Sequence, residues 1–105
     1  MITVSGVKTA DAANALAGTD LQSAPTAGII LIYVSSSQAD TNVSISAPPN
    51  MAARSIQPQL RANGVPLVSD DIPYVLAVQG GEQIILNVDI VTSATCGYVV
   101  IFQEA

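Results

Sequence analysis

The order of hydrophobic and polar side chains along this chain predicts short β-strands. A continuous apolar run over residues 29–34 has the length of one strand and no polar alternation, which is typical of a central strand covered on both faces. Residues 43–47 alternate strictly between apolar and polar side chains, as a strand with one face in water does. Strands are also expected over residues 2–7, 74–78 and 98–102, where β-branched and aromatic residues gather.

A longer strand is expected over residues 83–91. The pair Gly80-Gly81 forms a tight turn directly before it, so we expect this strand to pair with the one at 74–78. The candidates for its inward face alternate along it: Ile84, Leu86, Val88 and Ile90.

The dipeptide Asn63-Gly64 predicts a hairpin, because both residues tolerate the positive φ angles of a type I′ turn. This hairpin would pair residues 58–62 with residues 65–68.

Prolines restrict the region between the alternating strand and this hairpin. Residues 48–50, Pro-Pro-Asn, are expected to end the alternating strand. Pro58 cannot donate a ladder hydrogen bond, so a strand with inward Ile56 and Leu60 is restricted to a sheet edge or a bulge.

Residues 9–27 lack a clear strand pattern. Their alanines favour a short helix, which Thr9 would cap and Gly18 would end. An isolated helix of this length is only marginally stable, so an extended arm lying on a neighbouring subunit is the alternative. The whole pattern predicts an all-β fold: a single antiparallel β-sandwich or jelly-roll-like domain over residues 1–105. Its residues 1–27 would form a strand plus the arm or helix, and residues 28–105 the β core.

Charge is scarce in this sequence. Three basic and eight acidic residues make up 10% of the chain, against roughly 25% in an ordinary soluble domain. We expect such a surface to be covered in the working state, which favours a homo-oligomer or a larger assembly; a monomer with a neutral polar surface is the alternative. The net charge of −5 argues against nucleic-acid binding, which needs a basic patch. No secretion signal is expected, and no apolar run approaches the roughly 20 residues of a membrane helix.

The sequence offers little catalytic chemistry. It contains no histidine, so we expect no enzyme of the Ser-His-Asp or Cys-His kind, and no metal or cofactor. The pair Asp70-Asp71 has the residue type for glycoside hydrolysis or Ca²⁺ binding, but adjacent side chains in a loop point apart, and a solvated loop is expected. The single cysteine, Cys96, is interpreted as a small packed side chain.

Five residues are candidates for an interface. Tyr33, Tyr74 and Tyr98 are of a type enriched at interfaces, although packing in the core is their more common role. Arg54 and Arg61 could each form a two-pronged pair with a carboxylate of a neighbouring subunit, or a plain surface salt bridge.

The chain from residue 28 to 103 resembles small bacteriophage virion proteins of the capsid decoration or cement type. The features that carry the resemblance are the apolar run at 29–34, the alternation at 43–47, Asn63-Gly64, and Gly-Gly-Glu at 80–82 before a long strand. The resemblance implies a β-sandwich or jelly-roll subunit, often trimeric, that binds the major capsid protein or other virion subunits. Such a protein is made in the host cytoplasm and is located in the virion.

These observations predict a structural protein that stabilises a phage shell through protein–protein contacts. A carbohydrate-binding or adhesion module of sandwich architecture is the alternative, although aromatic residues are only 4% of the chain.

Overall fold

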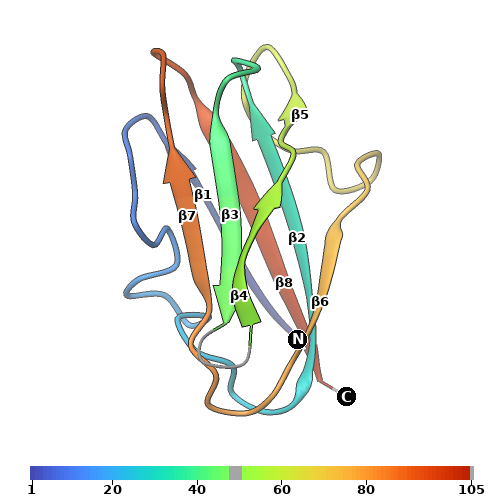
Figure 1. Cartoon of the computed structure of the whole chain (residues 1–105). Coiled ribbons are helices and arrows are strands. Elements are labelled where there is room, and N and C mark those ends of the chain that lie inside the picture. Colours follow the sequence, from blue (N-terminus) through green and yellow to red (C-terminus); the bar gives the residue numbers. More distant parts are fainter. Residues whose placement is uncertain (48–50, 105) are drawn as a thin grey trace.

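The computed structural model describes residues 1–47 and 51–104, and the described chain is built from β-strands without a helix (Figure 1). This confirms the all-β class. The strands, in chain order, are β1 (Ile2–Lys8), β2 (Gly28–Ser36), β3 (Asn42–Ala47), β4 (Met51–Ile56), β5 (Gln59–Leu60), β6 (Tyr74–Val78), β7 (Ile85–Asp89) and β8 (Cys96–Glu104). The described residues therefore contain no helix that could cross a bilayer.

One sheet has five strands. β8 lies between β1 and β2, antiparallel to both, and the other edge of β2 pairs with β6 at one end and β5 at the other. The apolar run at 29–34 is thus a central strand, as predicted. β6 is antiparallel to β2, whereas β5 is parallel to it.

The second sheet has three antiparallel strands in the order β4-β3-β7. The alternating segment at 43–47 forms its middle strand and turns Val43, Ile45 and Ala47 inward, as expected. The register between β3 and β4 shifts between Ile45 and Ala47, which marks a β-bulge. The residues predicted to end this strand, 48–50, lie outside the described residues.

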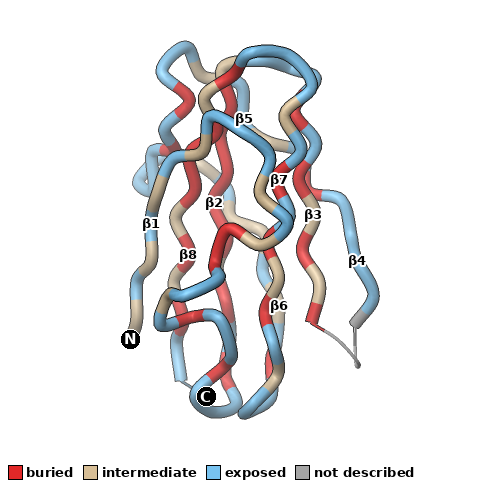
Figure 2. The backbone as a smooth tube through the Cα atoms, turned by 90° about the vertical axis from the view of Figure 1, so that its left-hand side faces the viewer, coloured by how far each residue is buried: buried red, intermediate tan, exposed pale blue. Residues whose placement is uncertain are grey.

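The two sheets lie in two layers and share one hydrophobic core (Figures 1 and 2). Each layer contributes alternate residues of its strands, because successive side chains of a strand point to opposite faces. The fully or almost fully buried members include Ile30, Ile32, Val100 and Phe102 from the five-stranded sheet, and Val43, Ile45, Leu86 and Val88 from the three-stranded sheet. This arrangement is consistent with the sandwich expected from the sequence.

Residues 9–27 do not form the predicted helix, and they lie on their own domain rather than extending as an arm onto a neighbouring subunit. Their backbone pairs with the free edge of β7: Ala12 and Val88 exchange N–H···O bonds of 2.9 and 2.8 Å, and the Ala15 N–H donates to Leu86 O at 2.7 Å. Leu16 and Leu21 are fully buried in the core. The edge of β7 satisfies the backbone and the core accepts both leucines, which outweighs the helix propensity of the alanines.

The prediction of a hairpin at Asn63-Gly64 is wrong. Gly64 has φ +67°, but none of the described non-glycine residues has positive φ, so a type I′ turn does not form. Instead the Gly64 N–H donates to Arg61 O at 3.0 Å, and Gly64 O accepts the Gly97 N–H at 2.6 Å. The turn therefore directs the chain across β8 rather than back along β5.

The predicted pairing of residues 74–78 with 83–91 is also wrong. β6 pairs with β2, while β7 pairs with β3 in the other sheet, so the turn at residues 79–82 joins the two layers. Crossing between layers lets the apolar faces of both strands pack on the same core from opposite sides. The expected inward residues of the second segment are confirmed, with Ile84 fully buried and Ile90 packed against the core.

The chain passes from one sheet to the other at Pro58. β4 ends at the buried Ile56, and after Gln57-Pro58 the chain continues as β5 in the other sheet. Ile56 is inward as predicted. Leu60 is not, because β5 lies at a sheet edge and leaves 62% of this residue exposed.

Candidate functional site

The outer face of the five-stranded sheet carries no charged side chain over its central rows. In the ladder, Thr3 lies beside Ile101, Ile101 beside Leu31, and Leu31 beside Val75, so one uncharged row crosses four strands. We call the set of outward residues on these strands the uncharged face: Thr3, Ser5, Val7, Ile29, Leu31, Tyr33, Val75, Ala77, Val99, Ile101 and Gln103.

Several apolar members of this face are exposed. Val75 is 57% exposed, Val7 50% and Ile29 41%. The exposure of Ile29 departs from the prediction that residues 29–34 are covered on both faces, because in the described chain the layer that packs on this sheet lies on its inner side only. An uncharged sheet face with several exposed apolar side chains is often an interaction surface.

The outer face of the three-stranded sheet is different. Its cross-strand neighbours are mostly polar, with Asn42 beside Asp89 and Ser44 beside both Asn87 and Ser55. The domain therefore has one outer sheet face suited to water and one suited to another apolar surface.

Residues 61–71 pack near Gly97, at the start of β8 and therefore at one end of the uncharged face. A Cβ placed on Gly97 would lie 2.4 Å from Gly64 O and 3.0 Å from Pro66 Cδ, so this loop packs directly on the outer side of β8. The loop exposes Val65, Leu67 and Val68. It thereby extends the apolar surface beyond the strands.

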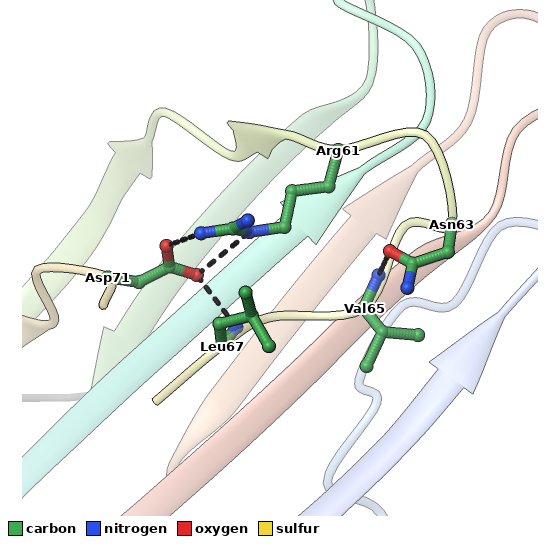
Figure 3. Close-up of polar contacts among 5 residues, drawn as sticks. All are labelled: Arg61, Asn63, Val65, Leu67 and Asp71. Atoms are coloured by element: carbon green, nitrogen blue, oxygen red, sulfur yellow. Dashed lines mark hydrogen bonds and ion pairs between the residues drawn. The ribbon is translucent and has the colours of Figure 1, made fainter. Parts of the chain in front are cut away.

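A salt bridge between Arg61 and Asp71 fixes this loop (Figure 3). The Asp71 carboxylate pairs with Arg61 Nη2 and also accepts hydrogen bonds from Arg61 Nε at 3.4 Å and from the Leu67 N–H at 2.9 Å. The hydrogen bonds from Arg61 hold the pKa of Asp71 below its ordinary value, and those to Asp71 raise the pKa of Arg61. The pair is therefore charged at neutral pH.

This arrangement bears on the expectations for Arg61 and Asp71. Arg61 was a candidate for pairing with a neighbouring subunit or for a plain salt bridge, and the structure has the second: its partner is Asp71 of the same chain. Asp71 was expected in a solvated loop, yet its side chain is only 7% exposed because the loop folds around it. A carboxylate with a lowered pKa and three hydrogen bonds is also a poor general acid.

The tyrosines occupy three different positions. Tyr98 points into the core, where its hydroxyl donates to Ala15 O at 3.2 Å, so it is not an interface residue. Burial raises its pKa. Tyr74 packs at the margin of the core, and Tyr33 belongs to the uncharged face but is only 8% exposed. The fold therefore does not bring these three tyrosines to one surface.

Arg54, the remaining candidate, is exposed on β4. It lies in the other sheet from the uncharged face, and the structure does not bring it together with Arg61 or the tyrosines. The more exposed residues Val7, Ile29 and Val75 were not selected from the sequence. All three residues lie in apolar segments of the sequence. Which side chains of those segments point outward is clear only when the pairing of the strands is known.

Cys96 is fully buried, which confirms its interpretation as a small packed side chain. Burial raises the pKa of its thiol to about 11. We expect the native protein at pH 8 to react with a thiol reagent about 100-fold or more slowly than a free cysteine, since so little thiolate is present. Labelling rates with a chromogenic disulfide measure this. The chain in denaturant is the control and should react at the free rate; fast native labelling would contradict the buried position.

A cleft of about 190 Å³ opens between the layers beside Asp71 and Tyr74. Ligand pockets usually measure about 300–1,000 Å³. Three open surface hollows of about 340, 410 and 350 Å³ lie beside Ala13, Arg61 and Asn42, but none of the three is lined by a group of metal-ligating side chains. Within residues 1–47 and 51–104, no three potential metal ligands gather at one point. Comparison with protein-family models, with curated proteins and with solved structures found no match for this chain. The uncharged face, with its exposed apolar side chains, is the candidate site.

Proposed function

We propose that this protein is a structural virion subunit, a capsid decoration or cement protein that binds other shell proteins through its uncharged face. The observation that carries the proposal is the contrast between the two outer sheet faces, one apolar and uncharged, the other polar. Protein interfaces are depleted of charge at their centre, because charged groups are costly to remove from water.

The size of the face supports binding in many copies. Four strands at their usual spacing are about 19 Å wide, and six residues along them cover about 20 Å, which gives a flat area of about 400 Å². A standard interface buries about 800 Å² on each partner, so one such contact is weak on its own. Weak contacts repeated on a multi-subunit shell reinforce one another.

The choice of a viral shell as the partner comes from the resemblance of residues 28–103 to phage decoration proteins. In this proposal the partner is the major capsid protein or another virion subunit, and the protein is made in the host cytoplasm and located in the virion. The scarcity of charge, 10% of the chain, fits a surface that is covered after assembly.

We expect Val75→Lys to reduce binding to the shell by about tenfold or more, because it places an unpaired charge in a desolvated contact, on the most exposed apolar side chain of the face. The measurement is co-sedimentation with shells formed by a co-expressed phage major capsid protein. Asn87→Lys adds the same charge to the exposed polar face and should bind as the unchanged protein does.

Circular dichroism and thermal unfolding verify that both variants keep the fold. A protein that does not sediment with shells, or a Val75→Lys variant that binds as tightly as Asn87→Lys, would contradict the proposal. Saturable binding to a glycan array would instead support an adhesion module.

A further inference from the structure

β1 presents a free strand edge. Its seven residues pair with β8 in a continuous register from Ile2 beside Phe102 to Lys8 beside Cys96, with no bulge. In Figure 2, β1 is the outermost strand of its sheet. Within the described part of the chain, no backbone pairs with its other side. The outward N–H and C=O groups of about 23 Å of strand are therefore available to a partner.

The other edges of the two sheets are protected. Residues 12–22 cover β7 with hydrogen bonds that include Ile84 N–H to Gln22 O at 3.0 Å. β4 carries a bulge and the charged Arg54. The edge beside β2 is divided between β5 and β6, of two and five residues, each preceded by a proline. Short strands, bulges, charges and prolines are the usual means of preventing edge pairing, and within β1 only the terminal Lys8 is charged.

The inward side of β1 is also incompletely covered. Ile2 and Val4 pack against the core but remain half-buried, whereas Val100 and Phe102 beside them on β8 are buried. A further strand beside β1 would complete the layer over both residues.

We infer that β1 pairs antiparallel with β1 of a second copy of this chain, about a two-fold axis at Ser5. Only this register pairs all seven residues, from Ile2 opposite Lys8 of the second copy to Lys8 opposite its Ile2. It places no like charges opposite each other, and Thr3 faces Val7 of the second copy. The five-stranded sheet then continues across both copies, with the uncharged faces on one side.

The contact is isologous and closes at two copies. We therefore propose a dimer as the unit, in place of the trimer expected from the resemblance. The inference concerns the edge of β1 and does not depend on whether the uncharged face binds a shell.

Two cysteine variants test the contact. Across an antiparallel pair, the Cα atoms of the two Ser5 residues would lie about 4.5–5.5 Å apart, within the range of a disulfide. The two Thr3 residues would lie about 13 Å apart, beyond that range. Thr3 and Ser5 are both exposed residues of β1, and the native Cys96 is buried.

We expect the unchanged protein to have twice the mass of the 10.7 kDa chain in native mass spectrometry. Under mild oxidation S5C should form a reducible covalent dimer about tenfold or more faster than T3C, because pairing raises the local thiol concentration. A mass of one chain, or equal rates for the two variants, would overturn the inference.

Failure of this contact and failure of the proposed function are distinguishable. Val75 lies on β6, separated from β1 by β2 and β8. The Val75→Lys variant should therefore remain a dimer while it loses shell binding. Loss of the dimer in that variant would show that the copies associate through the uncharged face and would overturn the pairing of β1.

Discussion

Replacing Leu16 by alanine should lower the free energy of unfolding by about 2–5 kcal/mol, the range for large-to-small changes in a packed core. Leu16 is fully buried although it lies in the irregular segment between β1 and β2. The Asn14 side chain fixes its position, because Asn14 Oδ1 accepts the Leu16 N–H at 3.0 Å and the Leu86 N–H at 3.1 Å. The shorter alanine side chain leaves a cavity between this segment and β7.

Urea unfolding measures the effect, and Leu60→Ala is the matched control. Leu60 is 62% exposed, so its removal should change stability by about 0.5 kcal/mol or less. Equal effects of the two substitutions would mean that residues 9–27 do not belong to the core of this domain.

Gly64→Ala should cost about 3 kcal/mol or more, from two separate causes. The positive φ of +67° is unfavourable for alanine by about 1–2 kcal/mol. In addition, the new Cβ would lie 2.1 Å from the backbone oxygen of Thr95, and the chain can relieve this overlap only by moving the loop at 61–71 away from β8.

Gly18→Ala separates the two causes. Gly18 has φ +77°, but a Cβ there meets nothing within 4 Å, so only the cost of the backbone conformation remains. Thermal unfolding of both variants should show a clearly larger loss for Gly64→Ala. A loss no larger than that of Gly18→Ala would contradict the close packing of the loop on β8.

The strands were predictable from the sequence because they depend on local patterns. The apolar run at 29–34 and the alternation at 43–47 identify β2 and β3 through the burial of neighbouring side chains. Pairing was less predictable, since it depends on contacts between distant parts of the chain. A tight turn at Gly80-Gly81 can join two paired strands of one sheet or two strands of different sheets. Nothing in the local sequence shows that it joins the two layers.

The candidate site shows the same limit. Arg61 and Asp71 are ten residues apart, and only the path of the loop brings them together. Tyr98 is a core residue because Gly6, its neighbour on β1, leaves space for the ring: a Cβ on Gly6 would lie 2.6 Å from the Tyr98 hydroxyl oxygen. Gly6 and Tyr98 can both be read from the sequence. That Gly6 leaves space for the tyrosine ring can be predicted only when the register of β1 and β8 is known.

The position of β8 between β1 and β2 constrains the order of events during synthesis. The strands at residues 2–8 and 28–36 are synthesised before the other strands of this sheet, but they are neighbours only through residues 96–104. Until that last strand is available, the five-stranded sheet cannot close and the apolar side of β2 remains open on the nascent chain. Pairing over such sequence distances is slow compared with local folding, so we expect the addition of β8 to limit the rate at which this sheet folds.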